Sequence, residues 1–304
     1  MSVSPRWPNG PPWRCWRKGN SVVATHKTVL VTGASDGIGA ASARQLAARG
    51  HRVLITGRSK EKIEAVAHET GAKAFIADYT RLDDVRRLAD EVRAELDGAG
   101  LDVLANNAGG LFGDRARTID GHEKTFQVNH LAPFLLTELL RDALRVGAGG
   151  RSSVINTSSI GNRLFGHLDL DDLNNDKKFS ANKAYGDAKL ANILHARGLQ
   201  ARYHDQGLSA VAFHPGNVAT NFASDTTSFM RFIYQTPLKR LNLISADRGG
   251  ANLTWFVDGT PGTTWQPGAY YDQQKLTTKV NPQALDDALV DGLWERSAAL
   301  VGIA

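Results

Sequence analysis

Short apolar runs alternate with helical patterns along most of the chain. The apolar runs, typical of buried strands, lie at 28–32, 52–56, 73–77, 101–105, 153–157, 208–213 and 269–271. Segments with helical spacing of apolar residues lie between them, at 39–49, 59–70, 82–96, 121–145, 182–204 and 246–257. Strands buried on both faces read as continuous apolar runs connected through helices. The pattern predicts an α/β fold: a doubly wound Rossmann-type parallel sheet with helices on both faces, in a single domain.

The first 25 residues depart from this pattern. They hold four basic residues and no acidic one, three of the six tryptophans and four of the ten prolines. They lack the apolar core of a secretory signal. We therefore expect a disordered, basic, Trp- and Pro-rich tail over 1–25 and a folded domain over 26–304. The alternative is that the tail is an arm that contacts a membrane or a partner through its Trp and Arg side chains.

Charge and composition exclude several classes of function. The formal net charge is +5, and the tail supplies four of these charges, so the folded domain has no electrostatic basis for binding nucleic acid. No apolar run approaches the roughly 18 residues that span a bilayer. The single cysteine, Cys15, cannot form an intrachain disulfide, and a reducing, cytoplasmic location is expected. The histidines show no metal-ligand spacing, and we predict no metal site.

A glycine-rich turn follows the first predicted strand. A dinucleotide pyrophosphate binds at such a turn, on the N-terminus of the following helix. Gly33 permits a tight turn, Gly37 lets the backbone approach phosphate, and Gly39 lets helix and strand pack closely. Such a turn alone is often only structural, but its place before the first of several helix–strand units favours a dinucleotide site. The residues expected to contact the cofactor here are Gly33, Ser35, Asp36, Gly37, Ile38 and Gly39.

The end of the second predicted strand should choose between NAD and NADP. NAD-binding folds place an acid there to hold the ribose 2′-hydroxyl. This chain has no carboxylate at that point, and Arg58 and Ser59 suit a 2′-phosphate instead. Asp36 argues mildly against a phosphate because it would repel one, and Arg58 could be an ordinary exposed turn residue. We expect NADP(H).

Tyr185 and Lys189 are four residues apart in the predicted helix 182–204. This spacing puts both side chains on one helical face, although it also occurs on solvated faces. A nearby positive charge favours the phenolate form, and a tyrosine so activated can exchange a proton with an alcohol or ketone oxygen. Polar or turn residues also follow the other predicted strands, where ligands bind in open α/β sheets. They are Asp78, 106–109, 158–159 and 215–216.

Together these motifs resemble the short-chain dehydrogenase/reductase family, from about Lys27 to the C-terminus. The residues that carry the resemblance are Gly33-x-x-x-Gly37-x-Gly39, Asn106-Asn107-Ala108-Gly109, Asn129, Ser159, Tyr185-x-x-x-Lys189 and Pro215-Gly216-x-Val218-x-Thr220. The resemblance implies an NADP(H)-dependent oxidoreductase that interconverts a lipophilic alcohol and its ketone or aldehyde by hydride transfer. A non-enzymatic NADP-sensing or scaffold protein on the same fold, or a double-bond reductase of the protochlorophyllide type, are the alternatives.

The resemblance also implies a role for each matching residue. Tyr185 is the expected general acid/base, and Ser159, the second serine of its doublet, the hydroxyl that polarises the substrate carbonyl. Lys189 would lower the pKa of Tyr185 and hold the nicotinamide ribose, and Asn129 would hold a water in a proton relay to Lys189. Asp78 would contact the adenine, Asn106 the adenosine side, and Val218 and Thr220 the nicotinamide carboxamide. Tyr79, Ala108, Gly109, Pro215 and Gly216 complete the expected cofactor site.

A narrower resemblance lies in three further segments. The 25 residues between Ser159 and Tyr185, including the acid-rich stretch 169–176, are similar to those of retinol dehydrogenases, WW-domain oxidoreductases and protochlorophyllide reductases. Segments 268–272 and 293–295 also resemble this branch, which mostly uses NADP(H). Retinoid specificity does not follow.

Two regions of the sequence leave alternatives open. The apolar segment 221–243 is either packed against the body of the domain or a mobile lid over an apolar pocket. The family also forms homodimers and homotetramers through helices that correspond to 121–145 and 182–204, so either assembly is possible here.

Overall fold

The computed structural model describes residues 26–145, 147, 150–217 and 243–304. The predictions for the tail 1–25, for Val218 and Thr220, and for nearly all of segment 221–243 therefore lie outside the described residues. Among the described helices, none is long and apolar enough to cross a membrane.

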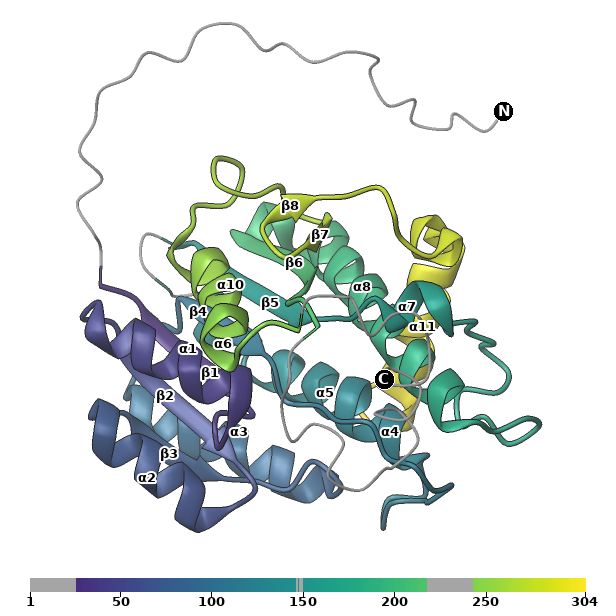
Figure 1. Ribbon diagram of the computed structural model, residues 1–304, viewed down its shortest axis with the longest axis horizontal. Helices are drawn as coiled ribbons and strands as arrows, with labels where there is room; N and C mark the ends of the chain where they lie inside the picture. Colours follow the sequence, from purple (N-terminus) through teal and green to yellow (C-terminus); the bar gives the residue numbers. More distant parts are fainter. Residues whose placement is uncertain (1–25, 146, 148–149, 218–242) are drawn as a thin grey trace, which may run out of the picture.

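One mixed sheet of eight strands organises the described residues (Figure 1). Its order is β3-β2-β1-β4-β5-β6-β7-β8, parallel throughout except for β8, which is antiparallel to β7. The strands are β1 (Thr28–Thr32), β2 (Arg52–Gly57), β3 (Lys73–Ile76), β4 (Val103–Asn106), β5 (Ser152–Thr157), β6 (Leu208–His214), β7 (Tyr270–Asp272) and β8 (Lys275–Leu276). The predicted doubly wound fold is confirmed.

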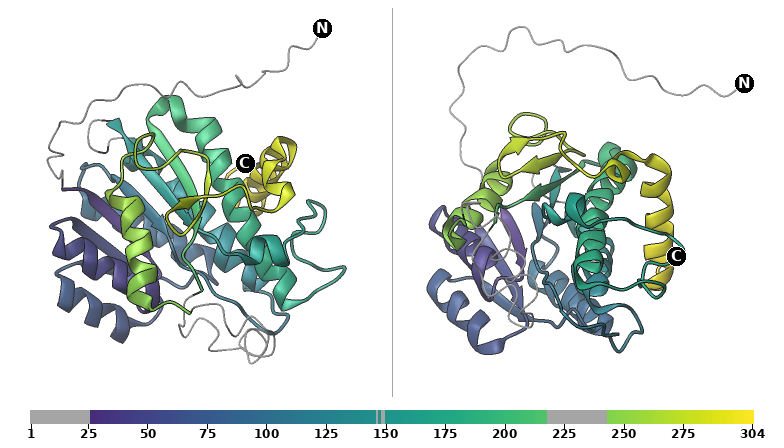
Figure 2. Two further views of the ribbon diagram at one scale, coloured as in Figure 1. Left: turned by 45° about the horizontal axis from the view of Figure 1, so that its top comes forward. Right: turned by 45° about the vertical axis from the view of Figure 1, so that its right-hand side comes forward.

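Helices cover both faces of the sheet, and each face has its own core (Figure 2). Alternate residues of a strand enter opposite cores, as Val29 and Leu30 of β1 do. One core includes residues of α1 (Gly37–Ala48), α2 (Lys60–Thr70) and α10 (Ala246–Asp258). The other includes residues of α3 (Leu82–Leu96), α5 (Ala132–Leu139), α8 (Ala181–Tyr203) and α11 (Asp287–Leu300).

The strand order reverses direction at β1, which lies between β2 and β4. In open α/β sheets the crevice at such a switch point, outside the carboxyl ends of the strands, is where ligands bind. The turns after the parallel strands β1 to β6 therefore meet at one edge of this sheet. The fold places every predicted turn motif on the same side of the molecule.

The predicted helix 121–145 is not one helix. The structure divides it into α4 (Lys124–Phe126), a π-helical segment (Gln127–Leu131), α5 and α6 (Arg141–Arg145). The Asn129 side chain donates a 2.8 Å hydrogen bond to the Thr125 carbonyl and so enters the backbone ladder, which is one known cause of a break in regular helical bonding. Strand β8, the short α7 (Gly161–Leu164) and α11 were not predicted.

Helix α11 covers part of the surface expected for subunit contacts. Arg197 and Arg202 of α8 pair with Asp287 and Asp291 of α11. Almost every residue of α8 from 184 to 199 is buried within this one chain. A homodimer or homotetramer stays a prediction, and α8 offers it less free surface than the sequence suggested.

Candidate active site

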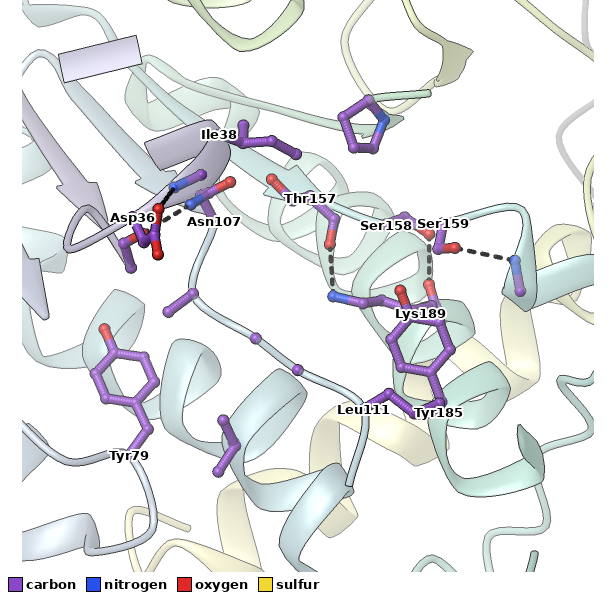
Figure 3. Close-up of a pocket in the computed structure, with 18 of the residues that line it drawn as sticks. Asp36, Ile38, Tyr79, Asn107, Leu111, Thr157, Ser158, Ser159, Tyr185 and Lys189 are labelled. Carbon is purple, nitrogen blue, oxygen red and sulfur yellow. Dashed lines mark hydrogen bonds between the residues drawn. The ribbon is translucent and has the colours of Figure 1, made fainter. Parts of the chain in front are cut away.

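A cavity of about 890 Å³ lies at the carboxyl edge of the sheet (Figure 3). It extends from the glycine-rich turn, across the ends of β2 to β6, to the first turns of α8. Most of the residues predicted from the sequence line it: Gly33, Ser35, Asp36, Gly37, Ile38, Arg58, Asp78, Tyr79, Ala108, Gly109, Ser159, Tyr185, Lys189, Pro215 and Gly216. Gly39, Asn106 and Asn129 do not line it.

The glycine-rich turn needs its glycines for different physical reasons. Gly33 and Gly37 have φ of 66° and 57°, in the left-handed region where glycine is favoured. A Cβ on Gly33 would also lie 2.7 Å from the Ala108 Cα. A Cβ on Gly39 would overlap the Gly33 carbonyl oxygen and lie 2.7 Å from Asn107 Nδ2. Gly39 therefore acts from outside the cavity, by letting α1 pack against the turn.

The N-terminus of α1 carries an ion pair at the rim of the cavity. The carboxylate of Asp36 caps the helix by accepting a hydrogen bond from Gly37 N, and its second oxygen lies 3.2 Å from Lys62 Nζ. Lys62 also lines the cavity and was not predicted as a site residue. Its charge offsets that of Asp36, which weakens the argument that Asp36 would repel a 2′-phosphate. Arg58 is exposed at the same rim and has no hydrogen-bond or ion-pair partner among the described residues.

These groups fit a phosphate-bearing dinucleotide. The Ser35 hydroxyl is buried and has no hydrogen-bond partner within the described part of the chain. It lines the cavity beside the helix N-terminus, where free backbone N–H groups favour anions. After β3, the Asp78 carboxylate accepts a hydrogen bond from Thr80 N, and burial raises the pKa of Tyr79, which keeps its phenol neutral.

The prediction for Asn106 is wrong in its geometry. Asn106 ends β4 and is buried, and its amide donates to Thr137 Oγ1 and Asn156 Oδ1, both at 3.0 Å. Its side chain therefore faces the core and not the cofactor cavity. The next residue, Asn107, lines the cavity and donates from its side chain to the Thr32 carbonyl at 2.9 Å. Asn107 thus ties the turn after β4 to the end of β1.

Tyr185, Lys189 and Ser159 meet at the opposite end of the cavity from Asp36 and Tyr79 (Figure 3). Tyr185 forms a side-chain hydrogen bond with Ser159. Lys189 Nζ lies 5.5 Å from the centre of the Tyr185 ring and donates to the Thr157 carbonyl at 3.3 Å. The structure also separates the two serines, because Ser158 Oγ donates to the Lys189 backbone carbonyl at 2.7 Å. Ser158 fastens β5 to α8, whereas Ser159 faces the tyrosine.

The pKa shifts differ from those expected. Burial raises the pKa of Tyr185 to about 12, although the hydrogen bond with Ser159 acts in the opposite direction. Burial also lowers the pKa of Lys189 to about 7. At neutral pH the ammonium is only partly charged, so it does not produce the lowered tyrosine pKa that the sequence suggested. Burial thus favours the neutral form of both side chains, the phenol of Tyr185 and the amine of Lys189.

Asn129 lies behind the cavity wall and close to Lys189. Its side-chain amide donates to the carbonyls of Gly110 and Thr125, both at 2.8 Å, and its oxygen accepts from Gly110 N at 3.1 Å. A Cβ on Gly109 would overlap Asn129 Oδ1 and lie 3.1 Å from Lys189 Nζ. Asn129 therefore fixes the turn after β4, and only the missing side chain of Gly109 leaves room between it and Lys189.

The wall near Tyr185 is mostly apolar. It is formed by the turn after β4, by the segment after Ser159 and by Leu243. Of these, only Leu243 belongs to a segment, 221–243, for which a place over an apolar pocket was considered from the sequence. The apolar residues that line it are Leu111, Phe112, Ile160, Leu164, Phe165 and Leu243. Arg163 is the charged residue among the described lining of this wall, and it is exposed. The sequence signal was weak because these residues are separated by up to 132 positions and share no periodic pattern.

Comparisons with known proteins agree with this geometry. The family model described as short chain dehydrogenase matches residues 27–230, and the chain belongs to this family. It is 40% identical over 283 residues to the "Putative daunorubicin C-13 ketoreductase DnrU" of Streptomyces sp. (strain C5), covering 91% of this chain and 93% of that protein. It is 34% identical over 289 residues to human retinol dehydrogenase 13, covering 91% of this chain and 85% of that protein.

A solved structure supports the same assignment. A crystal structure of a Mycobacterium paratuberculosis protein superposes with a TM-score of 0.71 at 31% identity, covering 91% of this chain and 93% of that one. The chain is thus a short-chain dehydrogenase/reductase, and its relatives confirm the resemblance to the retinol dehydrogenase branch.

Proposed function

We propose that this protein is an NADP(H)-dependent oxidoreductase that interconverts a lipophilic alcohol and its ketone or aldehyde. The observation that carries the proposal is a single cavity with two chemically different ends. One end holds the helix N-terminus, Ser35 and Arg58, and the other holds Ser159, Tyr185 and Lys189 beside an apolar wall. A dinucleotide and a carbonyl compound can therefore lie end to end in one site.

The side chains supply the proton chemistry of the reaction. When bound, the nicotinamide supplies or accepts the hydride. Ser159 donates a hydrogen bond to the substrate oxygen, and Tyr185, whose raised pKa keeps it protonated, gives that oxygen a proton during reduction. Lys189 lies beside the Tyr185 ring. With a pKa of about 7, it can return a proton to the Tyr185 oxygen at neutral pH.

The apolar wall supports a lipophilic substrate. Phe112, Leu164 and Phe165 line the cavity, and Leu164 is 48% exposed. An apolar group that covers this wall gains about 25 cal/mol for each Å² removed from water. Excluding water from this wall also lowers the local dielectric constant and so strengthens the hydrogen bonds at the substrate oxygen.

A spectrophotometric screen of NADPH oxidation tests the proposed function. The purified protein is incubated with aldehydes, ketones and quinones of increasing apolar size, and absorbance of NADPH is followed. Turnover that rises with apolar size is the expected result. Binding of NADPH without turnover across the panel would favour a sensor or scaffold instead, and product analysis separates carbonyl from double-bond reduction.

Arg58 should determine the preference for NADPH. The Arg58→Ala substitution removes charge-assisted hydrogen bonds to the 2′-phosphate, so the KM for NADPH should rise about ten- to a hundredfold while the KM for NADH stays nearly unchanged. The matched control is Lys60→Ala, which removes a neighbouring exposed cation that pairs with Glu64 and does not line the cavity. A preference of the parent protein for NADH would contradict the cofactor assignment.

A further inference from the structure

Three consecutive residues at the end of β5, the last of them just after the strand, attach to α8 around Lys189. Asn156 Nδ2 donates to the Asn192 backbone carbonyl at 3.1 Å, and Ser158 Oγ donates to that of Lys189 at 2.7 Å. Between them, the Thr157 carbonyl accepts two hydrogen bonds from α8, from Asn192 Nδ2 at 3.0 Å and from Lys189 Nζ at 3.3 Å. All of these side chains are buried. The ammonium of Lys189 and the amide of Asn192 therefore share one acceptor.

This sharing constrains Lys189. A carbonyl oxygen has two lone pairs, and Asn192 occupies one of them from a fixed position on the same helix. The Lys189 ammonium must then approach the Thr157 carbonyl oxygen from its other side. The remaining N–H groups of the ammonium can donate into the cavity that Lys189 lines. The amide N–H group also presents its positive end near the ammonium and weakens the carbonyl as a partner for it.

We propose that Asn192 is a positioning residue for Lys189, which directs Nζ toward the Tyr185 end of the cavity and limits how tightly Thr157 holds the ammonium. Only its effect on turnover rests on the proposed function. Without Asn192, the Thr157 carbonyl would belong to Lys189 alone, and the charged form of Lys189 would be more stable. The inferred effect is therefore a rise in the pKa of Lys189 when the amide is removed.

The surroundings make that rise measurable. The ionisable groups near Lys189 on α8 itself are Tyr185, Asp187 and His195. The π-helical segment adds His130, β6 adds His214 and β7 adds Tyr270. Burial lowers the pKa of His130 to about 3 and of His214 to about 4, and that of His195 well below its usual value. Burial raises the pKa of both tyrosines, and Asp187 is paired with Lys183. Between about pH 6 and 9, Lys189 is the group expected to change its charge here.

Two substitutions of Asn192 test the proposal. Asn192→Leu removes the amide at similar volume and should raise the pKa of Lys189 by about one unit. Asn192→Asp keeps the shape, places a carboxylate beside the ammonium and should raise this pKa further. The measurement is the pH dependence of acetic anhydride labelling of Lys189, followed by peptide mass spectrometry. The pH profile of kcat should also move to higher pH, further for Asn192→Asp than for Asn192→Leu. The KM for the carbonyl compound should change little.

The control separates positioning from loss of stability. Thr254→Val breaks a buried hydrogen bond with Ser42 away from the cavity and should leave the labelling profile of Lys189 unchanged. If both Asn192 variants titrate like this control, the proposal is wrong. Asn192→Asp preserves the shape of the side chain and decides the question if Asn192→Leu fails to fold. Labelling needs no turnover, so an inactive parent protein would overturn the proposed function without affecting this test.

Discussion

Replacing Tyr185 with phenylalanine should lower kcat for carbonyl reduction by about 10³-fold, within the range that a positioned acid or base contributes. The phenol is the protonated group that faces Ser159, and phenylalanine has no proton to give. The ring itself should stay in place, because it packs against Gly161, whose added Cβ would lie 3.0 Å from a Tyr185 ring carbon. The affinity for NADPH should therefore change little. Steady-state kinetics with the best carbonyl compound of the screen, together with an NADPH fluorescence titration, measures both quantities.

The control for this substitution is Tyr203→Phe. Tyr203 ends α8, and its hydroxyl contacts Glu138 and Arg141, none of which lines the cavity. Loss of that hydroxyl should leave kcat within about twofold, because it touches neither substrate nor cofactor and removes about 1 kcal/mol of stability. Full turnover by the Tyr185→Phe variant would refute the role of Tyr185 as the proton donor. Equal loss in both variants would point to a general effect on folding.

The sheet could be predicted from the sequence because its strands are short, apolar and buried on both faces. The division of the helix 121–145 was not predicted, although Pro133, at the start of α5, is a sequence signal for a break in helical bonding. Asn129 bonds to the Thr125 carbonyl, a contact that no periodicity reports. The missed α11 did carry a sequence signal: its cap, Asp286, accepts from Leu289 N, and its buried apolar residues Leu289, Val290 and Leu293 lie at helical spacing.

The candidate site was predicted best where a sequence motif fixes the backbone. It was predicted less well where packing decides the direction in which a side chain points. Asn106 and Asn107 are neighbours, yet the register that pairs Asn106 with Asn156 turns the first of them into the core. Lys62 reaches Asp36 only because α2 lies beside the start of α1. The pKa shifts of Tyr185 and Lys189 depend on depth of burial, which spacing along a helix does not reveal.

Replacing Gly39 with alanine should weaken NADPH binding about a hundredfold and destabilise the domain by a few kcal/mol, as overpacking of a rigid contact does. The new Cβ would overlap the Gly33 carbonyl oxygen, and both contacts belong to backbone or to an anchored amide, so the glycine-rich turn must move. The Gly71→Ala control has φ of 68° but meets nothing within 4 Å, and should cost only about 1 kcal/mol with NADPH affinity retained. Thermal unfolding and NADPH fluorescence titration measure the two effects. Equal affinity in both variants would show that close packing of α1 on the turn is not what shapes the cofactor site.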